Sequence, residues 1–131
     1  MANPNIVSVS SIYGGNYGWN LSTGLTTSLV EVDTDKLLKI NRIVCTNVHA
    51  TDAADLNLYI DVLATANANG LTVTGADATV YLAKVISVPA NASLVITDTP
   101  IYLLAGNILK GGTSASSTLD LFISYEVLDD A

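Results

Sequence analysis

The chain has 131 residues, of which 50% are hydrophobic and 13% charged, and its formal net charge is −7. This length predicts one domain spanning residues 1–131, and the hydrophobic content excludes a disordered chain. With only five basic residues, the chain offers no basic patch for a nucleic acid or an anionic membrane surface, so we expect neither as a partner.

The first thirty residues carry no charged side chain. They contain no apolar run long enough to cross a membrane, and Met1–Asn5 lacks the basic and apolar regions of a signal peptide. We therefore expect a soluble protein made in a cytoplasm. Residues 1–20 are a candidate N-terminal arm, with a short β run at Ile6–Ile12 and a turn at Gly14–Asn16.

A period of two, typical of β-strands, begins in the next part of the chain, with strands expected at Thr26–Val32, Lys36–Val48 and Leu56–Val62. In the second of these, the apolar residues change parity near Asn41–Arg42, which predicts a β-bulge. In the third, the alternation predicts that Leu58 and Ile60 face the core.

Short strands separated by turns continue to the end of the chain. Asn67–Gly70 ends in Asn-Gly, which predicts a hairpin. Thr79–Val88 is apolar on both parities, which predicts a central strand. In Leu119–Val127 the alternation points Leu121 and Ile123 toward the core. Further strands are expected at Leu71–Thr74, Ser93–Thr97 and Ile101–Leu104, and turns at Pro89–Asn91, Asp98–Pro100 and Gly111–Thr113.

Strands at this spacing predict an all-β protein, an antiparallel β-sandwich or a barrel, with at least seven strands. No segment predicts a long amphipathic helix, and only the Ala-rich stretches Asp52–Ala54 and Leu63–Ala68 could form a turn of helix.

Cys45 and His49 are the only candidates for a nucleophile and its base, since the chain has one cysteine and one histidine. On a strand, residues four apart lie about 13 Å from one another, too far for a hydrogen bond. We expect Cys45 in the core and His49 in a loop. One Cys and one His also exclude a zinc site built from those ligands.

The carboxylates give no clear catalytic or metal-binding pattern. Asp33-Thr34-Asp35 has the local spacing of a calcium loop but lacks its glycine and its distal glutamate. Glu31 and Glu126 are the only glutamates, and no pattern brings them together as a glycosidase pair would require. Gly106–Gly111 is not a phosphate loop, because its lysine precedes the second glycine. We expect no enzyme activity, no cofactor and no metal.

The most distinctive segment is Tyr13–Asn20, which places Tyr13, Tyr17 and Trp19 among glycines and asparagines. Three interpretations stay open. The aromatics cover the end of their own sandwich, they anchor a contact with another subunit, or they form a platform on which a sugar stacks.

Four short motifs resemble those of small virion proteins of tailed bacteriophages, especially marine and cyanobacterial phages. They are, in order, a strand ending in Thr-Asn, a Val-Pro-Ala turn, a Tyr-Leu…Gly hairpin and a closing Ser-Tyr-Glu strand. These correspond to Lys39–Asn47, Val88–Leu94, Ile101–Asn107 and Ile123–Val127. The likeness covers roughly residues 36–128, and no functional residue is carried over from it. It implies a jelly-roll-like sandwich that binds a phage capsid or tail as a decoration (cement) protein, often as a trimer.

The expected function is therefore a non-enzymatic structural protein of a tailed-phage virion, assembled in the host cytoplasm and attached to the major capsid protein or to another virion protein. We expect a homo-oligomer, with the trimer favoured by the resemblance, and Tyr13, Tyr17 and Trp19 as candidate interface residues. Two alternatives remain. One is a tail, neck or fibre component, and the other is a carbohydrate-binding β-sandwich that uses the same three aromatics.

Overall fold

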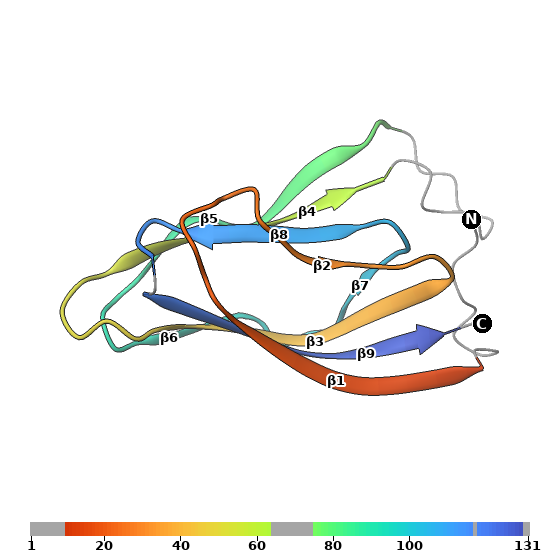
Figure 1. Ribbon diagram of the computed structural model, residues 1–131, viewed down its shortest axis with the longest axis horizontal. Coiled ribbons are helices and arrows are strands. Elements are labelled where there is room, and N and C mark those ends of the chain that lie inside the picture. Colours follow the sequence, from red (N-terminus) through yellow and green to blue (C-terminus); the bar gives the residue numbers. More distant parts are fainter. Residues whose placement is uncertain (1–9, 64–74, 117, 130–131) are drawn as a thin grey trace.

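A computed structural model describes residues 10–63, 75–116 and 118–129, and these form two antiparallel sheets packed face to face (Figure 1). The first sheet has the order β1-β9-β3-β6, and β7 also pairs with β3. The second sheet has the order β2-β8-β4-β5. The fold is thus an all-β antiparallel sandwich, as the alternation predicted. The strands are β1 (Ser11–Asn20), β2 (Ser28–Glu31), β3 (Lys36–Asn47), β4 (Ala54–Val62), β5 (Ala78–Val88), β6 (Ser93–Thr97), β7 (Ile101–Leu103), β8 (Ile108–Thr113) and β9 (Leu119–Asp129).

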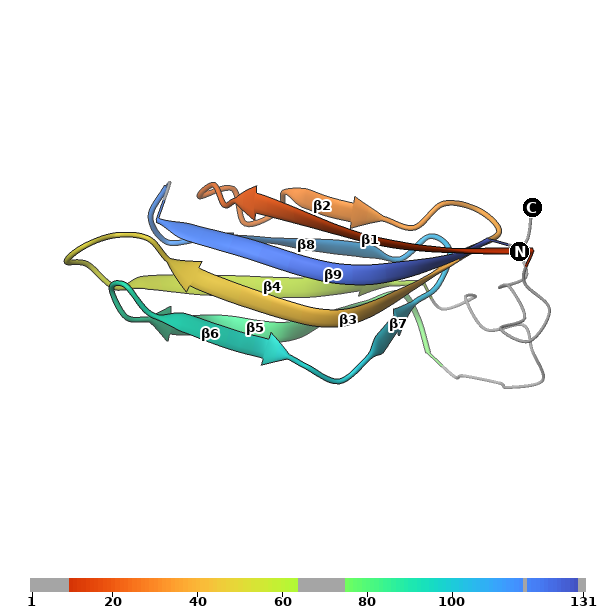
Figure 2. The same ribbon diagram turned by 90° about the horizontal axis from the view of Figure 1, so that it is seen from below.

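The strands pair as one long hairpin that is rolled up. β1 pairs with β9, β2 with β8, β3 with β6 and β7, and β4 with β5. β6 and β7 lie one after the other along β3, separated by the turn at Asp98–Pro100, and together occupy one strand position. This winding of two Greek keys over two sheets is that of a jelly roll. Figure 2 shows β1 and β2 along one side of the sandwich and β5 and β6 along the other.

The core lies between the sheets and is filled by one parity of each inner strand. Leu58 of β4 and Leu121 and Ile123 of β9 are completely buried, and Ile60 is partly buried and packs against them, which confirms the predicted faces. The other completely buried hydrophobic residues are Ile40, Ile43, Cys45, Leu56, Val88, Leu103, Leu109 and Leu119.

The expected bulge in β3 is present. The register between β3 and β9 shifts between Ile40 and Arg42, so Ile40 and Ile43 both face the core although they are three residues apart. A bulge adds one residue to one strand, and this changes the parity of every residue that follows.

The N-terminal arm and its turn were wrong predictions for the residues that the structure describes. Ser11–Asn20 form β1, which pairs along its whole length with β9, and Gly14–Asn16 lie inside that strand. The hydrogen bonds between paired strands join backbone groups. A glycine-rich strand can therefore still be held at the edge of a sheet when a long neighbouring strand is available. Residues 1–9, which hold most of the Ile6–Ile12 run, lie outside the described residues.

Two predictions about the second sheet were also wrong. Thr79–Val88 is not central, since β5 is an edge strand in which only Ala83 and Val88 are buried. Gly111–Thr113 is not a turn, because β8 continues through it between β2 and β4. A Cβ at Gly111 would collide with the backbone of β4, so glycine here permits a close approach of two strands rather than a turn.

The remaining expectations concern short segments. Asp52–Ala54 is not helical, and no described residue lies in a helix that could cross a membrane. The hairpin at Asn67–Gly70, the strand at Leu71–Thr74 and most of Leu63–Ala68 lie outside the described residues.

Candidate binding groove and exposed apolar edge

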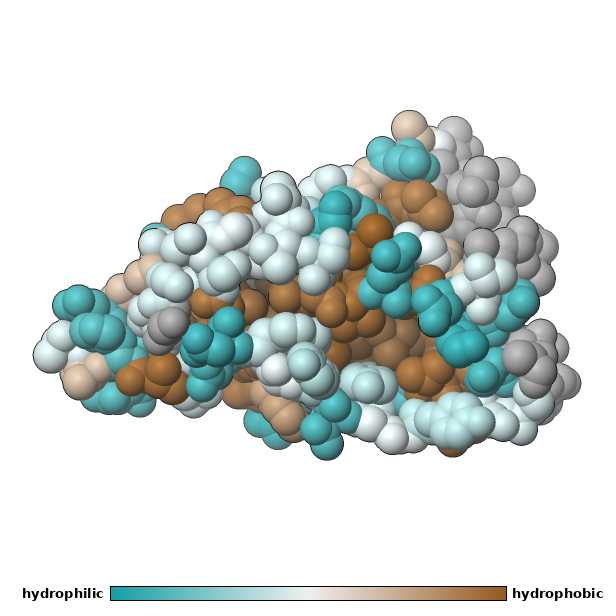
Figure 3. Space-filling model, in the orientation of Figure 1, coloured by the Kyte–Doolittle hydropathy of each residue, from teal (hydrophilic) through white to brown (hydrophobic). Residues whose placement is uncertain are grey.

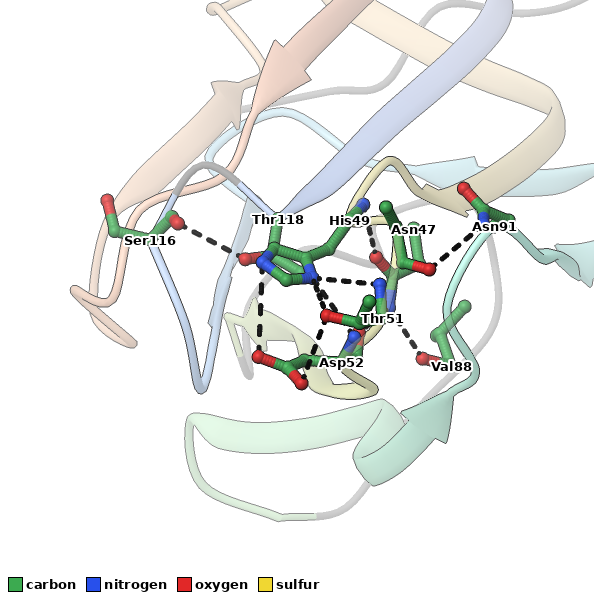
Figure 4. A network of polar contacts seen from close by, with 9 residues as sticks. Asn47, His49, Thr51, Asp52, Val88, Asn91, Ser116 and Thr118 are labelled. Atoms are coloured by element: carbon green, nitrogen blue, oxygen red, sulfur yellow. Dashed lines mark hydrogen bonds and ion pairs between the residues drawn. The ribbon is translucent and has the colours of Figure 1, made fainter.

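Cys45 and His49 do not form a catalytic pair. The Cys45 side chain is fully buried in the core, and this burial, with a smaller contribution from Asp120, raises the pKa of its thiol to about 11. His49 lies in the loop after β3, where its Nδ1 accepts hydrogen bonds from the backbone N–H groups of Asp52 (3.0 Å) and Thr51 (3.2 Å) (Figure 4). The thiol is therefore protonated at neutral pH and shielded from solvent, and the imidazole serves to shape its own loop.

The loops at this end of the sandwich are joined by Asn47, whose side chain is buried. Its Nδ2 donates to the carbonyl oxygens of Val88 (2.8 Å) and Asp52 (3.0 Å), and its Oδ1 accepts from the N–H of His49 (2.8 Å) (Figure 4). The Thr-Asn strand end and the Val-Pro-Ala turn, two of the motifs singled out in the sequence, thus meet in space and hold the fold together.

Residues 10–63, 75–116 and 118–129 contain no group of three or more His, Cys, Asp or Glu side chains arranged to hold a metal ion. The best-formed ion pair among the carboxylates joins Asp61 of β4 to Lys110 of β8, at 2.7 Å between Oδ2 and Nζ. The lysine hydrogen bond, reinforced by a second from Thr79, lowers the pKa of Asp61 below its ordinary range. This pair links neighbouring strands on the outer face of the second sheet.

A groove with a volume of about 520 Å³ opens between the edge strands β1 and β2. It exists because β1 has ten residues whereas β2, which lies across from it in the other sheet, has four. Figure 3 shows hydrophobic residues gathered in a hollow between the two sheets on this side. Its lining comes from Tyr17, Trp19, Leu29, Val30, Glu31, Val32, Asp33, Lys36, Leu38, Tyr125 and Val127.

Two of the three predicted aromatics form one wall of this groove. Tyr17 and Trp19 lie opposite Ile123 and Leu121 of β9, so their side chains are on the inner face of the sheet. Their ring centroids are 5.1 Å apart at an interplanar angle of 64°, an edge-to-face contact. Tyr13 shares their parity but does not line the groove, although it is as exposed as Tyr17, at 58% for each.

A third aromatic, Tyr125, was not singled out from the sequence. It pairs with Gly15 across the β1–β9 ladder, and its ring fills the space above that glycine, 3.0 Å from where a Cβ would lie. The parity of Ile123 placed Tyr125 on the inner face, but no local signal showed that the facing sheet stops short of it.

The polar residues of the groove are mainly acidic. Glu31 and Asp33 are exposed, and Lys36 is engaged with Asp129 at 3.5 Å. The lining thus holds two carboxylates against one lysine, which already pairs with a carboxylate outside it, so the groove favours ligands that are neutral or cationic over anionic ones.

A second surface lies on the opposite edge of the sandwich. The β5 patch consists of five exposed hydrophobic side chains, Val80, Tyr81, Leu82, Val85 and Ile86. Within residues 10–63, 75–116 and 118–129 no strand pairs with the outer side of β5, and two irregularities in its register with β4, near Leu82 and Lys84–Val85, expose residues on both of its faces. The sequence reasoning missed this surface because apolar residues on both parities were interpreted as burial on both faces.

Comparison with known proteins gives no relative, since neither a protein-family model nor a curated protein matches this chain. The features of the chain that bear on its function are therefore the groove, the β5 patch and the four sequence motifs.

Proposed function

We propose that the protein is a non-enzymatic structural component of a tailed-phage particle, a capsid decoration protein that stabilises the shell by binding across its subunits. The observation that carries this proposal is the β5 patch. Its five exposed apolar side chains are gathered on one edge strand, and exposed apolar surface gathered in one place marks an interaction site.

The chemistry of the described side chains supports an assembly role. The only thiol is buried and the only imidazole is engaged in its loop. Between Val80 and Ile86 the one charged residue is Lys84, whose Nζ lies over the Tyr81 ring, 5.1 Å from its centroid. A surface with so few charges limits the desolvation penalty of burying ions. Many copies on one shell would then convert a modest contact into stable attachment through multivalency.

The assignment to a phage particle rests on the four motifs, because the β5 patch alone does not indicate which protein binds to it. The same resemblance favours a homo-oligomer, most often a trimer, bound to the major capsid protein. A tail, neck or fibre component would use the same kind of surface, and the experiment below separates these locations.

The test is co-sedimentation of the purified protein with shells assembled from the major capsid protein encoded nearest to its gene. We expect the wild-type protein to pellet with shells and Val80→Asp to stay in the supernatant, because a charge in an apolar interface is costly. Val48→Asp is the matched control, since Val48 is equally exposed (50% against 49%) but lies in the loop after β3 and is not a member of the β5 patch.

Binding to shells that survives Val80→Asp would remove the β5 patch from the proposal. Absence of wild-type binding to shells, together with binding to purified tails, would replace the capsid by the tail as the partner. Absence of binding to both would contradict the phage role.

A further inference from the structure

The β1–β2 groove has a composition that the proposed assembly role does not require. Its floor is aliphatic, formed by residues such as Val32, Leu38 and Val127, and its wall carries the three aromatic rings of Tyr17, Trp19 and Tyr125. Carboxylates stand at its rim. A volume of about 520 Å³ is within the range of sites that hold small ligands.

We propose that this groove is a binding site for a neutral glycan, which it would hold by one or two pyranose units. A pyranose ring has a face of C–H groups and a circumference of hydroxyl groups. The C–H face matches the aromatic wall and the aliphatic floor. The hydroxyl groups match the carboxylates, which only accept hydrogen bonds and so pair with hydroxyl donors.

The aromatic wall has the exposure that stacking needs. Tyr17 is 58% exposed, and its edge-to-face contact with Trp19 leaves ring surface available on the side of the groove. Trp19 packs against the core on its other side, which holds it in a fixed orientation. A rigid ring loses little conformational entropy when a ligand binds to it.

The charges of the groove select against acidic sugars. Glu31 and Asp33 would repel a carboxylate or sulfate on the ligand, and the one lysine in the lining is engaged with Asp129. The groove and the β5 patch lie on opposite edges of the sandwich, so a glycan site would be a second function that operates while the β5 patch is occupied.

Trp19 gives this proposal a direct readout because it is the only tryptophan in the chain. The intact protein would first be applied to an array of neutral, amino and sialylated glycans. The neutral glycan with the strongest signal would then be titrated into the protein while Trp19 emission is followed. We expect neutral glycans to bind, sialylated glycans not to bind, and a saturable change in that emission.

Two tyrosines of β1 provide a matched pair of variants. Tyr17→Ala removes a ring that lines the groove, whereas Tyr13→Ala removes an equally exposed ring on the same strand that does not line it. We expect about three- to tenfold weaker binding for the first, from the loss of one stacked aromatic, and unchanged binding for the second. Thermal unfolding of both variants would establish that each keeps its fold.

Three results would overturn the glycan site. These are an array on which no neutral glycan binds, selective binding of amino or sialylated glycans, and an equal loss of affinity in the two tyrosine variants. None of them bears on the proposed capsid role, which is tested on shells with substitutions outside the groove.

Discussion

Asn47 provides the sharpest test of what holds the loop end of the sandwich together. Its side chain is 1% exposed and makes three hydrogen bonds, two as donor to backbone carbonyls and one as acceptor from a backbone N–H. Asn47→Ala would leave those three backbone partners without their hydrogen bonds, one of which is buried and two of which are partly buried. At about 1 kcal/mol for each, the expected loss in the free energy of unfolding is about 3 kcal/mol.

The measurement is urea unfolding at equilibrium, with a thermal scan in which a loss of this size lowers the Tm of a domain of this length by about 10 °C. The control is Asn20→Ala. Asn20 also makes a side-chain hydrogen bond, at 2.7 Å to Asp120, but the bond is exposed to solvent, and we expect a change within about 0.5 kcal/mol. If Asn47→Ala costs less than about 1 kcal/mol, water replaces the lost contacts and the loop junction does not depend on this residue.

Three further predictions follow from single side chains. Gly111→Ala should lower the free energy of unfolding by about 1–3 kcal/mol, because its methyl group would meet the backbone of β4. Gly14→Ala is the control and should leave the stability unchanged, because the space around Gly14 is open. Equal losses for the two variants in denaturant titrations would refute the close approach of β8 to β4. Because its pKa is raised to about 11, the Cys45 thiol should react with a thiolate-directed reagent at pH 8 far more slowly in the native protein than in urea. Similar reaction rates in the two states, measured by mass spectrometry, would contradict this prediction. Lys110 lowers the pKa of Asp61 in the folded protein, so this carboxylate should stabilise the fold at pH values above its ordinary pKa of 3.8. That stabilisation should be lost as the pH falls through the lowered pKa of the folded state. Asp61→Asn should therefore reduce the acid sensitivity of the protein, measured by denaturation between about pH 2 and 5.

The alternation of apolar residues was sufficient to predict the fold class and much of the core. Leu58, Leu121 and Ile123 were assigned to the correct face because side chains of a strand alternate strictly between its two sides. The bulge near Arg42 was also visible in the sequence, since an inserted residue reverses the alternation within the same strand. These features depend only on neighbours along the chain.

The candidate site was predicted in part. Tyr13, Tyr17 and Trp19 were singled out as candidate interface residues, and Tyr17 and Trp19 line the groove, while Tyr13 does not. The segment was interpreted as an arm because the rest of the chain holds enough predicted strands to close a sandwich without it. The ladder with β9, which comes more than a hundred residues later, makes it a strand.

What the sequence by itself determined is therefore local: the strand period, the inner face of each well-patterned strand, and the position of the bulge. The tertiary structure decided which strands have a neighbour on both sides. Thr79–Val88 has the apolar composition of a central strand, yet it lies at an edge because no other strand among the described residues pairs with its far side. The groove arises in the same way, from a long β1 facing a short β2 in the other sheet. Both surfaces depend on contacts between segments far apart in the chain, and no local pattern of residues encodes such contacts.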